Sequence, residues 1–146
     1  MFFVDSFILK YILLGRMGRD FHKLKIFNLS YAFLLDVYRF LPNLPEFEFR
    51  NIFSQLQRAA TSVVLNIVEG SSSMSNKVFL NHLNYSYGSC KEVEVLLLLC
   101  FDLGYIEKDL FSDLSSCLEE LKASLFLFMR SVDKEIFLKK NNYALV

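Results

Sequence analysis

The residues with the most chemical character lie at helical spacing in the middle of the chain. Steps of three and four residues separate amide, guanidinium, hydroxyl and carboxylate side chains at Gln55, Arg58, Ser62, Asn66 and Glu69. Such steps place side chains on one face of a helix. A fully exposed face would use Lys and Glu freely, whereas short Ser and Asn side chains alternate here with Ala and Val. The sequence therefore favours a half-buried polar network over a plain solvated face.

Gly88 and Glu92 complete this predicted network from the following helix. Folding the two helices back about the polar stretch 71–76 puts Arg58 opposite Gly88 and about one turn from Glu92. A guanidinium holds a carboxylate through two parallel hydrogen bonds, and a buried pair of this kind specifies register more than it adds stability. We predict a buried Arg58–Glu92 pair, whose loss in Arg58→Ala would cost roughly 3 kcal/mol. An interior glycine such as Gly88 also predicts close helix packing.

Histidines and cysteines show no spacing that indicates a metal or cofactor site. His22 and His82 are far apart and have no HxxxH or ExxH partner. Three cysteines without CxxC spacing indicate reduced core thiols: Cys90, Cys100 and Cys117. We expect no metal, no cofactor and no small-molecule substrate.

Two catalytic interpretations compete with a structural one. Glu69 and Glu92 have the chemistry of an acid/base pair, but Arg58 nearby would keep a carboxylate ionised and structural. The Arg16–His22 spacing is similar to that of HEPN-type bundle ribonucleases, although it precedes the first helix instead of lying in a late one. We therefore expect that the protein is not an enzyme. The remote alternative is a HEPN-like ribonuclease.

The periodicity predicts a single all-α domain. The chain has 146 residues, of which 53% are hydrophobic, and helical spacing recurs in four segments, about 21–41, 45–70, 76–103 and 110–132. Pro42, Pro45, Gly70 and Gly104 separate these segments. Short connections make consecutive helices antiparallel neighbours, so we expect an up-down four-helix bundle. In the first helix both apolar stripes, including Tyr31 and Tyr38, are expected to be buried.

The two ends of the chain differ from the bundle. Residues 17–138 form the expected domain, residues 1–16 are an extra N-terminal segment of doubtful structure, and residues 139–146 are expected to be a frayed tail. The apolar start is interrupted by Asp5 and Lys10 and lacks a basic n-region, which argues against a signal or membrane anchor. We expect a cytoplasmic protein.

Composition and charge bear on the partners. A chain with 16 Phe and a mean hydropathy of +0.32 has more apolar surface than a small monomer usually needs, which predicts self-association. Formal net charge is zero, so any nucleic-acid binding must come from a local patch. Candidate contacts in the mildly basic first part are Arg39, Arg50, Lys77 and Lys91. The second part of the chain is acidic, which suits contacts between copies.

Several of these positions together carry a family resemblance. The pattern consists of Pro45-x-x-Glu48, Ile52, Gln55-x-x-Arg58-Ala59, Ser62, Asn66-Ile67-x-Glu69-Gly70, Phe79, Leu83, Gly88-Ser89-x-x-Glu92-x-Glu94 and Leu103-Gly104-Tyr105-Ile106. Over about residues 21–132 it closely resembles the four-helix-bundle proteins encoded in 23S rRNA intervening sequences. The resemblance implies an antiparallel bundle assembled as a barrel-like homopentamer. It extends to accessory variability proteins of diversity-generating retroelements, which bind nucleic acid and a reverse transcriptase.

Two function classes follow. The first is a non-catalytic oligomeric scaffold or accessory protein that presents a surface to a protein or ribonucleoprotein partner. The second is an RNA- or DNA-binding accessory protein that acts with rRNA or a reverse transcriptase. The neutral charge favours the first. The sequence identifies neither the biological process nor the partner.

Overall fold

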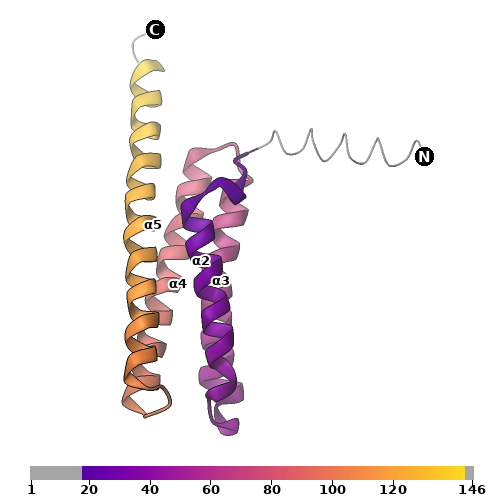
Figure 1. The fold of residues 1–146 in the computed structure, drawn as a ribbon. Coiled ribbons are helices and arrows are strands. Elements are labelled where there is room, and N and C mark those ends of the chain that lie inside the picture. The colour runs from indigo at the N-terminus through magenta and orange to yellow at the C-terminus, as the bar shows by residue number, and fades with distance from the viewer. Residues whose placement is uncertain (1–17, 144–146) are drawn as a thin grey trace, which may run out of the picture.

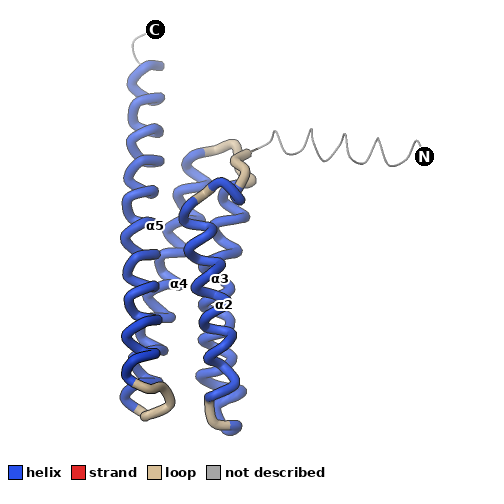
Figure 2. The backbone as a smooth tube through the Cα atoms, in the orientation of Figure 1, coloured by secondary structure: helices blue, strands red, loops and turns tan. Residues whose placement is uncertain are grey.

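The computed structural model describes residues 18–143, a unit of four α-helices with no strand among these residues (Figures 1 and 2). The α-helices are α2 (Lys25–Phe40), α3 (Ser54–Ser71), α4 (Asn76–Asp102) and α5 (Lys108–Tyr143). This confirms the predicted all-α fold. The predicted extra segment, residues 1–16, lies outside the described residues.

Short turns of helix connect α2 to α3. Pro42 and Pro45 cannot donate a backbone hydrogen bond, so α2 ends before them and the chain continues through 3-10 helices at Leu41–Asn43 and Glu46–Glu48. A π-helix, Phe49–Phe53, then leads directly into α3. Glu48 precedes this π-helix, and its side chain accepts a hydrogen bond from the backbone N–H of Ile52. The predicted start at Pro45–Glu48 is therefore a sequence of three helix types.

A serine precedes α4 and a glycine follows it, in the two remaining connections. Ser75 caps α4 by accepting a hydrogen bond from the Val78 N–H at 3.4 Å. Gly104 follows α4 with a φ of 75°, a conformation that favours glycine. The last helix is longer than the sequence predicts: α5 has 36 residues and includes 139–143, which belong to the predicted frayed tail.

Each α-helix packs against two others. α2 contacts α3 and α5, and α4 contacts the same two helices. The core between them is aliphatic and aromatic, and its largest fully buried side chains include Phe79, Leu56, Ile67, Leu97 and Leu121. No described helix combines the length and apolarity that crossing a bilayer requires.

Three sequence expectations about burial need correction. Tyr31 and Tyr38 are 49% and 44% exposed, because α2 turns its other stripe, with Phe33 and Val37, toward α3 and α5. Cys117 is exposed, whereas Cys90 and Cys100 are buried. A wide apolar helix face thus does not imply that all of it enters the core of one chain.

An arginine fastens the start of the described chain to one end of the bundle. The Arg19 N–H donates to the Ser71 carbonyl at 2.7 Å, and its guanidinium donates to Asn76 Oδ1 at 2.7 Å. The same guanidinium lies 3.6 Å from the Glu135 carboxylate and 4.7 Å from the centre of the Phe79 ring. Arg19 therefore ties together the end of α3, the start of α4 and the C-terminal part of α5.

Candidate functional site: the polar seam between α3 and α4

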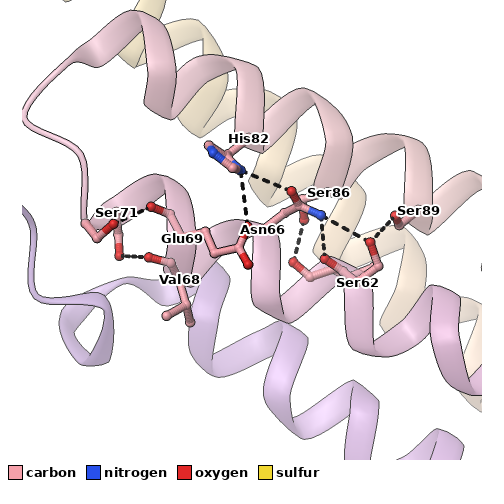
Figure 3. A network of polar contacts seen from close by, with 10 residues as sticks. Ser62, Asn66, Val68, Glu69, Ser71, His82, Ser86 and Ser89 are labelled. Atoms are coloured by element: carbon pink, nitrogen blue, oxygen red, sulfur yellow. Dashed lines mark hydrogen bonds and ion pairs between the residues drawn. The ribbon is translucent and has the colours of Figure 1, made fainter.

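Hydroxyl and amide side chains of α3 and α4 meet along the seam between these helices (Figure 3). The Ser89 hydroxyl donates to the Ser62 hydroxyl at 2.9 Å. The Asn66 amide donates to the same hydroxyl at 3.1 Å and to the Ser62 carbonyl at 2.9 Å. The buried Ser86 hydroxyl donates to the Val63 carbonyl at 2.8 Å. Ser62 and Asn66, two predicted positions, thus lie in a half-buried hydrogen-bonded network.

His82 ends this network toward solvent. Its Nδ1 lies 3.1 Å from Asn66 Oδ1 and 3.8 Å from Glu69 Oε2. Because the Asn66 oxygen can only accept, Nδ1 is the donor in this hydrogen bond. The Ser62 and Ser89 hydroxyls bond to one another instead of to the imidazole. In the described seam, the imidazole therefore contacts the Asn66 amide, and the two hydroxyls contact each other.

The predicted Arg58–Glu92 pair is wrong for a single chain. Arg58 and Glu92 are both exposed, and in the described part of the molecule neither lies within 4.0 Å of an opposite charge. Shorter side chains make the contacts across the seam instead, Ser62 with Ser89 and Asn66 with His82. Since exposed pairs contribute little, the large cost predicted for Arg58→Ala no longer follows.

Two other predicted positions lie beside the seam instead of in it. Gln55 is exposed and donates to Asn51 Oδ1 at 3.1 Å. Gly88 is exposed, and a Cβ atom placed there meets nothing within 4 Å. Close packing occurs instead at Gly70, where a Cβ would lie 2.7 Å from His82 Cβ and 2.7 Å from Phe79 Cδ2. The predicted close approach of α3 and α4 therefore occurs at their connected ends.

The four basic residues proposed for nucleic-acid contact do not form one patch. Arg39, at the end of α2, pairs with Asp36 at 2.7 Å, and Lys91, in the middle of α4, pairs with Glu94 at 2.9 Å. Arg50 lies in the π-helix before α3, and Lys77 lies in the first turn of α4. Arg50 and Lys77 therefore lie near opposite ends of α3, and the four residues are spread along the bundle.

A buried carboxylate that the sequence did not assign links the two other connections. Glu48 is only 8% exposed and accepts hydrogen bonds from the Tyr105 hydroxyl at 3.2 Å and the Asn51 amide at 3.0 Å. Burial and the negative charge of Glu48 raise the pKa of Tyr105. Glu48 and Tyr105 both belong to the family pattern, and each follows a connection that contains Pro or Gly. This shared position beside a connection could have predicted their contact.

A buried lysine between α4 and α5 was also missed. Lys122, with 7% of its side chain exposed, donates to Glu94 at 2.8 Å and also pairs with Glu119. Burial lowers the pKa of Lys122, but hydrogen bonds to Glu119 and Glu94 outweigh it and raise the pKa above its ordinary value. Hydrogen bonds from Lys122 and Lys91 lower the pKa of Glu94. The cluster therefore links α4, which carries Glu94, to α5, which carries Lys122.

The described cysteines and histidines are the remaining residues with possible redox or metal chemistry. Burial raises the pKa of the Cys90 thiol to about 12 and that of Cys100 to about 11, so both stay protonated at neutral pH. No group of three potential metal-ligating side chains occurs in residues 18–143. His22 is exposed beside Asp20, and Arg16, its partner in the ribonuclease-like spacing, lies outside the described residues.

These features define a helical-bundle protein with a hydrogen-bonded polar seam between α3 and α4. Residues 22–126 match the family model described as 23S rRNA-intervening sequence protein. The chain therefore belongs to this family, which confirms the resemblance seen in the spaced polar positions.

A solved structure has a similar fold. It is a protein with unknown function from the S23 ribosomal protein family of Bacteroides thetaiotaomicron, with 23% sequence identity and a TM-score of 0.67. The alignment covers 71% of this chain and 97% of that chain. Among curated proteins, none matches the chain.

Proposed function

We propose that this protein is a non-catalytic oligomeric scaffold or accessory subunit, an antiparallel up-down bundle assembled as a barrel-like homopentamer. The observation that carries the proposal is the exposed apolar surface. Tyr85, Val95 and Leu127 are 66%, 64% and 69% exposed. Monomeric proteins rarely leave large apolar patches in contact with water, so contacts between copies are the simplest use for this surface.

Two further observations support the architecture and the lack of catalysis. Partners across the seam run in opposite order along the two helices, Asn66 with His82 and Ser62 with Ser89, which is the order of an antiparallel pair. The buried thiols are protonated at neutral pH, and the seam hydroxyls have no base beside them. The polar residues therefore serve helix register better than chemistry.

Light scattering tests the proposal directly. At micromolar concentration the full chain is expected to show a mass five times the chain mass of 17.1 kDa. A monomer would contradict the scaffold proposal, and another defined multiple would contradict only the pentamer.

Binding of RNA or DNA is the second candidate, supported by Arg50 and Lys77, which have no ion pair within the described residues. Fluorescence anisotropy with a structured RNA at two salt concentrations tests it. A phosphate-binding surface must lose affinity steeply as salt rises. Binding that Arg50→Ala and Lys77→Ala weaken supports the candidate, and no binding at low salt removes it.

A further inference from the structure

Two exposed apolar faces lie on helices that are not neighbours in the bundle. The outer face of α4 exposes Tyr85, Val95 and Leu99, and the outer face of α2 exposes Tyr31 and Tyr38. Since α2 and α4 each pack against both α3 and α5, these two faces point to different sides of the unit. They are called the α4 face and the α2 face below.

A glycine interrupts the α4 face. Gly88 lies one helical turn from Tyr85 and from Glu92, and open space surrounds the position where its Cβ would lie. Glycine is unfavourable inside a helix, and no contact within the described chain requires it here. The bare backbone leaves room for a ring from another molecule.

The α2 face presents rings that are already held in place. Phe27 and Tyr31 stack with centroids 5.8 Å apart and planes at 20°. The Tyr38 hydroxyl accepts a hydrogen bond from Gln57 Nε2 at 3.1 Å. Rigid aromatic side chains lose little conformational freedom on docking, which makes them good interface anchors.

The two faces carry complementary charges. Arg58 and Tyr38 line the same groove, about 410 Å³ in volume, between α2 and α3. Glu92 lies on the α4 face next to Gly88. Both charges are exposed, and neither has an ion pair within residues 18–143. A positive charge beside the rings thus matches a negative charge beside the gap.

We infer that the α2 face of one copy docks on the α4 face of a second copy, with a tyrosine ring over Gly88 and Arg58 paired with Glu92 between the copies. The inference rests on the proposed oligomer and names its surfaces. Tyr31 and Tyr38 are seven residues apart, as are Gly88 and Val95, so both pairs span about 10.5 Å along their helices. Because the two faces differ, the contact is head-to-tail, the kind that closes into rings.

Filling the gap tests the docking surface. Gly88→Trp is expected to weaken self-association at least tenfold in sedimentation or light-scattering titrations, while circular dichroism shows an intact helical fold. Ser116→Trp adds the same side chain to an exposed position of α5 that has no exposed apolar residue one turn away, and it is expected to leave association unchanged. Tyr31→Glu supplies a second disruption, on the opposite face. Unchanged association in both Gly88→Trp and Tyr31→Glu overturns the inference.

Mixing charge variants tests the pairing between copies. Arg58→Glu and Glu92→Arg should each associate more weakly than the wild type, because each places like charges across the contact. An equimolar mixture of the two variants restores opposite charges at the contacts between unlike chains, so larger species should reappear. If mixing restores nothing, the intermolecular pair is excluded.

The same measurements separate this inference from the function proposed above. A wild-type chain that stays monomeric defeats the scaffold proposal itself. A wild-type oligomer that tolerates Gly88→Trp and Tyr31→Glu leaves the scaffold proposal intact and shows that other surfaces make the contact.

Discussion

At the scale of single residues, two glycines have opposite surroundings and opposite expected effects. Gly70→Ala would push a methyl group into His82 and Phe79, each 2.7 Å from the new atom. Overpacking of this kind should lower the free energy of unfolding by about 1–3 kcal/mol. Urea titration measures the change. Gly88→Ala is the matched control, because its methyl meets open space and should stabilise the dilute chain by up to about 1 kcal/mol. Equal effects at both positions would contradict the packing described for the seam.

The contact between Tyr105 and Glu48 predicts sensitivity to alkaline pH. Burial and the Glu48 charge raise the pKa of Tyr105 above its ordinary value of 10.0. The stability that this contact contributes is therefore complete below pH 10.0 and falls as the pH rises through the higher folded-state pKa. Tyr105→Phe should be less stable at pH 7 and should lose this alkaline component. Thermal melts between neutral and strongly alkaline pH check both points; an unchanged alkaline profile in the variant would rule out the contact as its source.

Glu94 predicts the opposite dependence, in acid. Hydrogen bonds from Lys122 and Lys91 lower its pKa below the ordinary value of 4.5. Its contribution is complete above pH 4.5 and disappears as the pH falls through the lower folded-state pKa. Because the carboxylate is 40% exposed, solvent screening limits the loss in Glu94→Gln to about 1 kcal/mol at pH 7.

Acid titration of unfolding free energy, compared with Glu120→Gln, checks this prediction. Glu120 is an exposed neighbour whose only ion pair in the described chain is a 3.9 Å contact with Lys25. The two variants should differ at pH 7 and converge in strong acid. Curves that coincide at every pH would show that the Lys122 cluster does not stabilise the fold.

At the scale of elements, the helix limits were predictable where Pro and Gly impose them. Pro42 restricts the backbone and Gly104 adopts a positive φ that favours glycine, so both effects can be read from the chain alone, whereas α3 continues through Gly70 to Ser71. The π-helix before α3 and the length of α5 were missed, since no buried apolar stripe marks the last turns of α5, where Phe137 and Leu138 are exposed. The partners of Ser62 and Asn66 were also missed in part. Helical spacing predicts which residues share a face, but it leaves the rotation of two helices about each other undetermined.

The long helix α5 should be uneven in its contribution to stability. Val132 is 1% exposed in the core, while Phe137, little more than one turn later, is 64% exposed. Val132→Ala should cost about 1–2 kcal/mol, whereas the larger deletion in Phe137→Ala should cost less than about 0.5 kcal/mol in the dilute chain. Urea titrations of both variants measure the difference. A larger cost at Phe137 would mean that the C-terminal part of α5 packs against something within the chain.

At the scale of the whole molecule, the proposed assembly makes thermal stability depend on concentration. An interface formed only by folded chains stabilises the folded state by mass action. The melting temperature of the wild type should rise with protein concentration, and that of Gly88→Trp should rise less. Differential scanning fluorimetry across a hundredfold concentration range measures both slopes. A wild-type melting temperature that is independent of concentration would argue against coupling between folding and assembly.

The contacts of Arg19 with Ser71, Asn76 and Glu135 have a practical consequence for labelling the molecule. Through them, the first described residues lie at the same end of the bundle as Ser71, Asn76 and Glu135, and α5 leaves the bundle at that end (Figure 1). The Glu48–Tyr105 contact lies at the other end, between the two remaining connections. A probe placed on a residue at either end of the described chain would therefore lie far from the Glu48–Tyr105 contact, at the opposite end of the bundle.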